Sequence, residues 1–383
     1  MIDFKPMKMR TNKSKSILFM LHLPPPVHGS SMVGQMIQES KEINSELECN
    51  YINLLASHTV AETGSVSFKK LLEFVFLWFK TLFSVAFNRP NLVYFALTTT
   101  GYAFLRDVLL IALLKLFHVK RIYHLHNKGV ANYQLKSIFR FLYKFVFKDA
   151  EVILLSKLLY EDVKAFVPES KVHICPNGIS DLFRGLESDR FSKSEELLHH
   201  TPELLFLSNL IESKGVYDLL EACAILKRND INFHCTFIGG EGDITLADFI
   251  ERVKRLDLSD KVDYVGKKFG NEKVNAYAVA DVFVFPTYYP KECFPLVLLE
   301  AMSAGLPVIS TYEGGIPDII VNGVNGYLVE QRNVQMLASQ LDKVLTDPDK
   351  CKEMGKAGRQ KFEKEFNIEI FEHKITQIFK VEI

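Results

Sequence analysis

The chain has 383 residues and a hydrophobic content of 48%, and no low-complexity tract interrupts it. This length exceeds one ordinary core and predicts two domains, and the composition excludes a disordered chain. The net charge is zero, but residues 1–180 carry 22 Lys and Arg against 13 Asp and Glu, whereas the remainder carries 24 against 33. A basic half joined to an acidic half favours an anionic surface or substrate on one side of the molecule.

Six scattered cysteines form no Cys-x-x-Cys pair, which favours reduced cytosolic thiols over disulfides or a metal cluster. The apolar run Ile17–Leu23 is too short for a signal peptide, and no stretch reaches about 18 uncharged apolar residues. We therefore expect a cytoplasmic protein with neither a signal peptide nor a membrane-spanning helix.

The first predicted strand, Ser16–Leu23, ends at three prolines and leads through His28 and Gly29 into a helix that starts at Met32. A serine in this loop would cap the helix. A glycine after a parallel strand allows a ligand to approach the backbone closely. His28 either belongs to a ligand site or is a loop histidine without a role.

Two predicted helices, Phe68–Asn88 and Lys136–Lys148, are rich in aromatic residues and lysines, the first with lysines at 69, 70 and 80. A basic amphipathic helix with exposed aromatic residues is typical of a membrane interface. The alternative is that both helices cover a sheet and bury their aromatic side chains. The sequence leaves both interpretations open.

The segment Asn91–Leu97 predicts a strand, Tyr102–Phe117 a helix and Val119–Leu125 the next strand. His126 follows this strand directly, at the edge where parallel sheets bind ligands. His124 lies two residues earlier on the same strand face, and we expect its side chain in or beside the sheet. We therefore prefer His126 to His124 as a site residue.

Short strands at Glu151–Leu155 and Lys171–Ile174 complete the first predicted sheet, and a Pro-Asn-Gly turn at 176–178 leaves it. Residues 181–200 are charged and rich in Ser and Glu, which predicts a linker.

Three predicted strands of the second half end in loops with polar residues or glycines. Strand Leu204–Leu207 leads to Asn209 and Lys214, strand Asn232–Ile238 leads to a glycine cluster that contains Gly240, and strand Lys261–Val265 leads to Gly266.

Residues 281–318 are the most informative stretch of the second half. A buried strand is followed by a loop with Glu292 and by a helix at Leu296–Ser303, which ends near Gly305. Glu292 precedes the helix N-terminus, where free N–H groups and the helix dipole attract phosphate, and Glu300 lies inside the helix. Two carboxylates in this arrangement fit a nucleotide diphosphate that carries a sugar.

These residues resemble the retaining glycosyltransferases of GT-B fold that carry a Glu-x7-Glu motif. The segments Glu-Cys-Phe-Pro from Glu292 and Glu-Ala-Met from Glu300 follow the motif almost letter for letter, and Gly-Gly-Ile-Pro-Asp at 314–318 matches the loop after the next strand. The resemblance implies that Glu300 holds the donor ribose hydroxyls and that Glu292 faces the donor sugar. It also implies backbone contacts to sugar and phosphate from Phe294, Pro295 and Leu296.

The same resemblance implies that Lys214 binds the donor diphosphate and that His126 contacts the donor sugar. The arginine that this family places five residues before the lysine is Asn209 here, which leaves one cation fewer for the leaving group. Close backbone approach to the donor is implied at Gly29, Gly240 and Gly266. We take His126, Glu292 and Lys214 as the catalytic residues.

The implied fold class is α/β, namely GT-B, with two doubly wound Rossmann-like domains that face each other across a cleft. The expected boundaries are an acceptor-side domain at 1–180, a linker at 181–200, a nucleotide-sugar domain at 201–366 and a helix at 367–383 that returns to the first domain. No metal and no cofactor is expected beyond the nucleotide-diphosphate sugar, with UDP favoured over GDP.

The implied reaction is hexosyl transfer from a nucleotide sugar to a saccharide acceptor with retention of configuration and without a covalent intermediate. We expect a lipid-linked acceptor, a role in surface polysaccharide or glycoconjugate synthesis, and reversible attachment to the cytoplasmic face of an anionic membrane, with no nucleic-acid partner. The alternatives are a nucleotide-sugar epimerase of the same fold and a non-catalytic two-domain ligand binder. A phosphorylase is disfavoured because we identify no lysine for its cofactor.

Overall fold

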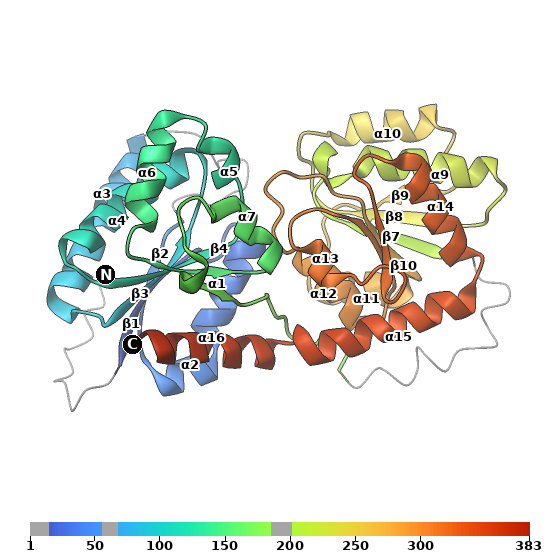
Figure 1. Ribbon diagram of the computed structural model, residues 1–383. Helices are drawn as coiled ribbons and strands as arrows, with labels where there is room; N and C mark the ends of the chain where they lie inside the picture. Colours follow the sequence, from blue (N-terminus) through green and yellow to red (C-terminus); the bar gives the residue numbers. More distant parts are fainter. Residues whose placement is uncertain (1–14, 56–67, 185–200) are drawn as a thin grey trace. The chain divides into compact units, whose positions relative to one another are not determined.

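The computed structural model describes residues 15–55, 68–184 and 201–383, which form two compact α/β units (Figure 1). The first unit contains most residues up to 175 together with the C-terminal residues 372–383. The second unit contains residues 176–371 and the short segment 155–159. Most of the linker expected at 181–200 lies outside the described residues.

The sheet of the first unit has six parallel strands in the order β2-β1-β3-β4-β5-β6. The central strands β1, β3 and β4 are buried along almost their whole length, as expected for parallel strands with apolar runs that are covered on both faces. The strands are β1 (Ser16–Leu21), β2 (Glu48–Asn53), β3 (Leu92–Leu97), β4 (Lys120–Leu125), β5 (Glu151–Leu154) and β6 (Val172–Ile174).

Helices cover both faces of this sheet. On one face, α3, α4 and α6 pack against alternate strand residues such as Val93 and Tyr123. On the other face, Phe379 of α16 lies edge-on to Phe19 and Tyr94, at ring-centroid distances of 5.4 and 5.6 Å. The helices of this unit are α1 (Gly29–Glu39), α2 (Lys41–Glu46), α3 (Phe68–Phe83) with a π-helix (Ser84–Asn88), α4 (Gly101–Leu116), α5 (Val130–Tyr133), α6 (Ser137–Phe147), α7 (Tyr160–Val163) and the end of α16 (Ile368–Glu382).

The second unit repeats this architecture, with six parallel strands in the order β12-β11-β10-β7-β8-β9. The carboxyl ends of parallel strands share one edge, and the loops that leave β7 to β10 there carry the candidate site. The strands are β7 (Glu203–Leu207), β8 (His234–Ile238), β9 (Val262–Tyr264), β10 (Val282–Phe285), β11 (Val308–Thr311) and β12 (Gly326–Val329). The helices are α9 (Val216–Arg228), α10 (Leu246–Arg255), α11 (Gly270–Val279), α12 (Leu296–Ser303), α13 (Ile316–Ile319), α14 (Val334–Leu345) and α15 (Pro348–Glu365).

The helix α12 has the bounds that the sequence predicts, Leu296–Ser303. Pro295 precedes its first turn, and Gly305 adopts a positive φ of 69° just beyond its last turn. A proline before a helix and a left-handed glycine after it are strong local end signals, which explains the agreement.

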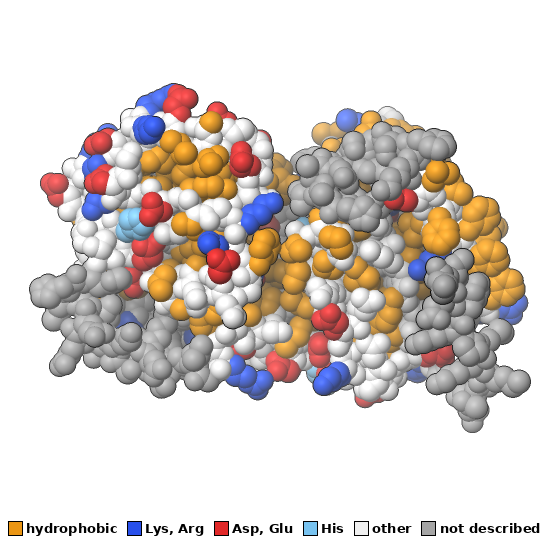
Figure 2. Space-filling view, turned by 180° about the vertical axis from the view of Figure 1, so that it is seen from behind, with side chains coloured by type: hydrophobic (Ala, Val, Ile, Leu, Met, Phe, Trp, Pro, Cys, Tyr) orange, Lys and Arg blue, Asp and Glu red, His pale blue; other side chains and the backbone are white. Residues whose placement is uncertain are grey.

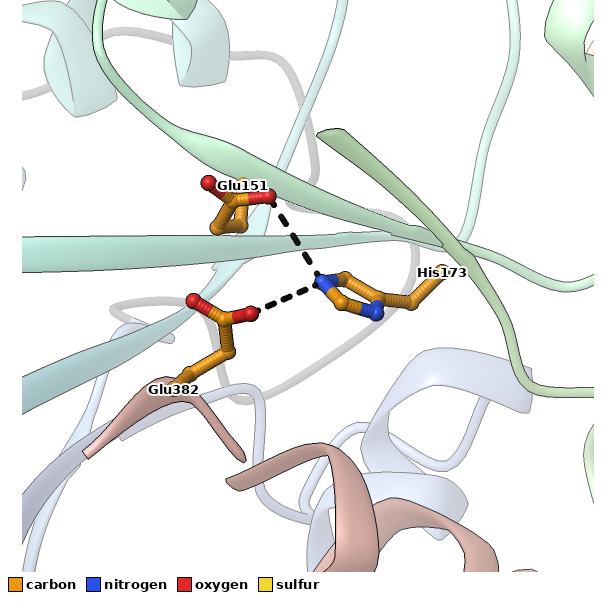
Figure 3. A group of neighbouring side chains, drawn as sticks. All are labelled: Glu151, His173 and Glu382. Atoms are coloured by element: carbon orange, nitrogen blue, oxygen red, sulfur yellow. Dashed lines mark ion pairs between the residues drawn. The ribbon is translucent and has the colours of Figure 1, made fainter. Parts of the chain in front are cut away.

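The end of α16 is joined to the first sheet by a chain of ion pairs (Figure 3). His173 Nε2, on β6, lies 3.3 Å from Glu382 Oε1 and 3.6 Å from Glu151 Oε2. Each carboxylate also pairs with a lysine, since Lys120 lies 2.9 Å from Glu382 and Lys171 lies 3.5 Å from Glu151. Together with Phe379, these contacts attach the last helix to the first unit.

One surface of the first unit is strongly apolar. The helices α3 and α6 bury one stripe against the sheet, including Leu77 and Tyr143, but expose another. Phe76 and Phe87 are each 71% exposed, and Phe141 is 67% exposed. In Figure 2, hydrophobic side chains gather on the side of this unit where Figure 1 places α3 and α4. Covering the sheet therefore explains only part of the aromatic content of these helices.

The expectation that no helix could span a membrane needs correction. Among the described helices, Leu71–Asn88 forms an 18-residue window with mean hydropathy 1.4, of which 11% is buried. This segment is long and apolar enough to cross a membrane by length and composition alone. The sequence criterion passed over it because the window contains Glu73 and Lys80.

Candidate active site

The loop before α12 holds Glu292 next to Lys214. The Nζ of Lys214 lies 2.5 Å from Glu292 Oε2, and both side chains are largely buried, with exposed fractions of 15% and 11%. The ammonium also lies 4.4 Å from the ring centre of Tyr289 and 5.4 Å from that of Phe285. The structure thus brings together two predicted site residues that are 78 positions apart in the chain.

Main-chain contacts join the loop of Glu292 to the loop of Lys214. The Tyr288 N–H donates to the carbonyl of Ser213 at 2.8 Å, and the Thr287 hydroxyl donates to the same carbonyl at 3.3 Å. Within the loop, the Glu292 N–H donates to the carbonyl of Tyr289 at 2.9 Å. The two charged side chains are therefore held by one connected set of backbone bonds.

Two adjacent glycines, Gly314 and Gly315, contact the backbone of the loop that carries Glu292. The Gly315 N–H donates to the carbonyl of Cys293 at 2.7 Å. Gly314 has a φ of 56°, and a Cβ there would lie 2.4 Å from the carbonyl oxygen of Glu292. Only glycine fits this position, so the Gly-Gly turn after β11 helps to fix the loop that carries Glu292.

Glu300 forms a second charged group inside α12. Its Oε1 lies 2.6 Å from Lys273 Nζ, and its Oε2 accepts a hydrogen bond from the Tyr277 hydroxyl at 2.8 Å. Burial, and secondarily the charge of Glu300, raises the pKa of Tyr277 well above its usual value, so this phenol remains a donor. A carboxylate oxygen accepts more than one hydrogen bond, so Glu300 can bind two further hydroxyl groups.

The first turn of α12 supplies main-chain donors, because the first amides of an α-helix have no intrahelical acceptor. Leu296 is the first residue of this turn and Pro295 is its N-cap. The side chain of Phe294 belongs to the core: its ring lies 5.7 Å from that of Phe366, and the residue is 4% exposed.

Asn209 and two glycines lie at the ends of neighbouring strands. The Oδ1 of Asn209 accepts a hydrogen bond from the Gly240 N–H at 3.1 Å, which joins the loops after β7 and β8. Gly266 has a φ of 71°, and nothing lies within 4 Å of a Cβ position there. The backbone at Gly266 is therefore open, whereas the side chain of Lys267 covers Gly240.

In the first unit, α1 begins at Gly29 rather than at the predicted Met32, and its cap is His28 rather than a serine. The His28 Nδ1 accepts from the Ser31 N–H at 3.2 Å, and the Ser31 Oγ accepts from the His28 N–H at 2.9 Å. His28 therefore has a structural role in a reciprocal cap. Nothing lies within 4 Å of a Cβ position at Gly29, so the backbone there is open.

His126 lies directly after β4, and His124 lies within that strand. His124 is fully buried, and its Nδ1 lies 2.7 Å from the Tyr94 hydroxyl. The two imidazole rings are 4.1 Å apart, on the same face of the sheet. Burial lowers the pKa of both histidines, to about 3 for His126, so both are neutral at pH 7. A neutral imidazole can donate one hydrogen bond and accept another.

His22 also lies at this edge. It is not among the predicted site residues, because the predicted strand ran two residues past the observed end of β1. Its Nδ1 lies 2.8 Å from Ser30 Oγ, and its ring lies 6.1 Å from that of His28. Burial, followed by the charge of Arg106, lowers the pKa of His22 well below its usual value, and burial also lowers the pKa of His28. The first unit thus presents four neutral imidazoles near the ends of β1 and β4, those of His22, His28, His124 and His126.

The metal-ligating groups that come together in the described residues are Glu151, His173 and Glu382, whose ligand atoms lie within 4.8 Å of one another (Figure 3). Because each carboxylate is already paired with a lysine, we interpret this group as a chain of ion pairs. The sequence also contains an Asp-x-Asp at 347–349, the kind of pair that metal-dependent transferases use. Asp347 caps α15, because its Oδ1 accepts from the Lys350 N–H at 3.0 Å.

Comparison with known proteins identifies part of the chain. Residues 187–361 match the family model described as Glycosyl transferases group 1, so this part contains a domain of that family. The chain is 30% identical to the amylovoran biosynthesis glycosyltransferase AmsK of Erwinia amylovora over 274 residues, which are 70% of this chain and 65% of AmsK. It is 30% identical to the putative colanic acid biosynthesis glycosyltransferase WcaL of Escherichia coli K12 over 203 residues, 51% of this chain and 49% of WcaL. The matched length is therefore about half to two thirds of these relatives.

A solved structure shares the fold over almost the whole chain. HepE of Anabaena, in complex with UDP, matches with a TM-score of 0.74 and 18% identity, covering 96% of this chain and 100% of HepE. An identity this low establishes the fold alone. The predicted α/β fold class, GT-B with two Rossmann-like units, is confirmed.

Proposed function

We propose that this protein is a glycosyltransferase that moves a sugar from a nucleotide-sugar donor to a saccharide acceptor. The observation that carries this proposal is the pair of lysine-bound glutamates at α12: Glu292 with Lys214 before the helix, and Glu300 with Lys273 within it. The domain match over residues 187–361 supports the same reaction. HepE has also been solved with UDP and glucose, which favours a UDP sugar over a GDP sugar as the donor.

In this proposal the nucleotide binds along α12. Glu300 accepts hydrogen bonds from the ribose hydroxyls with the lone pairs that Lys273 and Tyr277 leave unused. The first-turn amides and the helix dipole stabilise the diphosphate. The backbone of this turn and of Gly266 completes the donor site, with contributions from Phe294, Pro295, Leu296 and Asn209.

Lys214 is proposed to stabilise the leaving diphosphate. An ammonium has three N–H donors, so Lys214 can bind a phosphate oxygen while it keeps its bond to Glu292. Glu292 then faces the donor sugar, and its negative charge stabilises the positive charge that develops at the anomeric carbon. Fixed charges of this kind commonly account for much of an enzymatic rate enhancement.

The sugar is proposed to keep its anomeric configuration: an acceptor hydroxyl bonds to the anomeric carbon on the face from which the diphosphate departs, and the hydroxyl proton passes to the leaving diphosphate oxygen. Lys214 and the N-terminus of α12 supply the positive charge, so the mechanism requires no metal ion and no covalent enzyme intermediate. His126 is proposed to act on the transferred sugar as a neutral imidazole, because burial keeps its pKa near 3.

We further infer that the acceptor is lipid-linked and that the protein attaches to the cytoplasmic face of an anionic membrane. Exposed aromatic residues of α3 and α6 lie on the same helices as the exposed Lys80, Arg140 and Lys144, the composition expected for an interfacial surface. Because α3 packs Leu77 against the sheet, it would lie along a membrane rather than cross it. Relatives named for amylovoran and colanic acid biosynthesis support a role in polysaccharide or glycoconjugate synthesis.

A thermal-shift panel of nucleotide sugars tests the donor. A ligand at 100 times its Kd adds about 2.7 kcal/mol to the free energy of unfolding, which raises the Tm by a few degrees. We expect UDP sugars to raise the Tm and GDP sugars to leave it unchanged. Transfer of labelled sugar to a saccharide acceptor then distinguishes a transferase from an epimerase or a simple binder. If no nucleotide sugar changes the Tm, the proposal is wrong.

A further inference from the structure

Lys267, directly after Gly266, reaches across the end of the neighbouring strand β8. A Cβ built on Gly240 would lie 2.1 Å from Lys267 Cε and 3.0 Å from its Nζ, and 3.3 Å from Asn209 Oδ1. Because Gly240 has no side chain, the methylene groups of the Lys267 side chain fit beside it. The ammonium therefore lies beside Gly240, whose N–H donates to Asn209 Oδ1.

Lys267 differs in its partners from three other lysines near these strand ends. Lys214 pairs with Glu292 at 2.5 Å, Lys268 with Glu272 at 2.7 Å and Lys273 with Glu300 at 2.6 Å. No carboxylate lies within ion-pair distance of Lys267 in the part of the chain that the structure describes. Its charge is therefore not neutralised, although it lies beside the loop that begins with Asn209 and ends at Lys214.

The ammonium of Lys267 favours an anionic ligand. Lys214, Lys268 and Lys273 each have a glutamate partner, whereas Lys267 has no such partner among the described residues. A diphosphate carries more than one negative charge, so a second cation besides Lys214 can form a further charge-assisted hydrogen bond with it. Lys267 is also exposed, so a ligand can reach its ammonium without displacing a protein group.

We propose that Lys267 binds the diphosphate of the donor and supplies the cation that Asn209 does not. This inference rests on the proposed function and adds a residue to its donor site. Gly240 acts through Lys267 in this proposal: it contributes the space for the lysine stem rather than a backbone contact to the nucleotide.

The test is calorimetric titration of UDP and of uridine into the wild-type protein, Lys267→Gln and Lys267→Arg. The adjacent Lys268→Gln is the matched control. We expect Lys267→Gln to weaken UDP binding about tenfold, the order of one charge-assisted hydrogen bond, and to leave uridine binding unchanged. Lys267→Arg should keep the affinity for UDP, and Lys268→Gln should match wild type because Lys268 already pairs with Glu272.

Two other outcomes are informative. If Lys267→Gln and Lys268→Gln bind UDP equally well, Lys267 is a surface lysine and this inference is wrong, while the proposed function stands. If the wild-type protein binds no UDP at all, the proposed donor itself is wrong. Circular dichroism of each variant shows that the comparison is made on folded protein.

Discussion

At the scale of single residues, each glutamate of the candidate site is already bonded to a lysine before any ligand arrives. Glu292 contacts Lys214, and Glu300 contacts Lys273 and Tyr277. Such pairs keep largely buried charges compensated and hold both side chains in fixed positions. The donor site is therefore preorganised, because a ligand adds hydrogen bonds to groups that are already oriented.

Replacing His126 should lower the rate of sugar transfer without changing the affinity for the nucleotide. His126→Ala should lower sugar transfer by about 10²-fold or more, the range for a positioned polar catalytic group. The affinity for UDP should not change, because the groups proposed to hold the nucleotide belong to the second unit and His126 belongs to the first. Initial rates and calorimetry measure the two quantities. If His126→Ala retains full turnover while His124→Ala is inactive, the assignment is reversed.

His124 should make the stability of the first unit depend on pH. Burial holds its pKa well below 6.5 in the folded state, whereas the unfolded chain titrates near 6.5. As the pH falls below 6.5, only the unfolded state binds this proton, and the free energy of unfolding falls by up to about 1.4 kcal/mol per pH unit. This contribution is fully present above pH 6.5.

His124→Asn should remove that dependence. Urea unfolding at pH 7, 6 and 5 should show a shallower loss of stability for the variant than for wild type. Parallel curves for the two proteins would mean that His124 titrates normally in the folded state. The overall stability of the variant does not matter here, because the slope is the quantity compared.

At the scale of elements, the sequence predicted α12 within its observed bounds and placed Glu292 before it, because Pro295 and Gly305 mark both ends locally. It placed the end of β1 two residues too late, because apolar Leu23 still precedes the three prolines that end the predicted strand. It also missed the pairing of Lys214 with Glu292 and of Lys273 with Glu300. These contacts join separate elements, and no local pattern encodes them.

The same reason explains why Lys267 could not be found from the sequence. Its neighbour Lys268 has the same side chain, and only the three-dimensional structure shows that one is paired with Glu272 and the other lies across Gly240. Fold class, by contrast, was implied by the resemblance to the GT-B family, and that resemblance rests on motifs in the local order of residues.

The helix α16 should contribute strongly to the stability of the first unit. Phe379 is fully buried against Phe19 and Tyr94, so Phe379→Ala should lower the free energy of unfolding by about 3–5 kcal/mol. Val381, on the same helix, is 76% exposed, and Val381→Ala is the matched control with little expected effect. Urea denaturation measures both, and equal stability of the two variants would show that α16 does not pack as described.

At the scale of the whole molecule, the two halves of the chain differ in charge and in surface. Residues 1–180 have an excess of basic residues, and the described helices of this half expose aromatic side chains. Residues 181–383 have an excess of acidic residues and contain the glutamates of the candidate donor site. This division agrees with the proposal that the first unit contacts a membrane and the second binds the nucleotide.

The protein should co-sediment with anionic vesicles at low salt, bind neutral vesicles less and dissociate partly at high salt. Each basic residue near an anionic membrane contributes about 1 kcal/mol to the binding free energy, and salt screens this contribution. Lys80→Glu with Lys144→Glu should reduce the salt-sensitive part, and Phe76→Ser with Phe87→Ser the salt-insensitive part. The side chains of Lys69 and Lys70 lie outside the described residues and are left unchanged. Absence of wild-type binding at low salt would favour a soluble acceptor.

The claim that a nucleotide donor binds at α12 is tested most directly by titrating UDP into the wild-type protein, Glu300→Ala and the control Glu272→Ala. Glu272 is a lysine-paired glutamate like Glu300, but it lies on the exposed face of α11. Because each charge-assisted hydrogen bond to a ribose hydroxyl contributes about 1.5–3 kcal/mol, Glu300→Ala should bind UDP at least tenfold more weakly, while Glu272→Ala binds like wild type. Equal UDP affinity of Glu300→Ala and wild type, with both proteins folded, would contradict the claim.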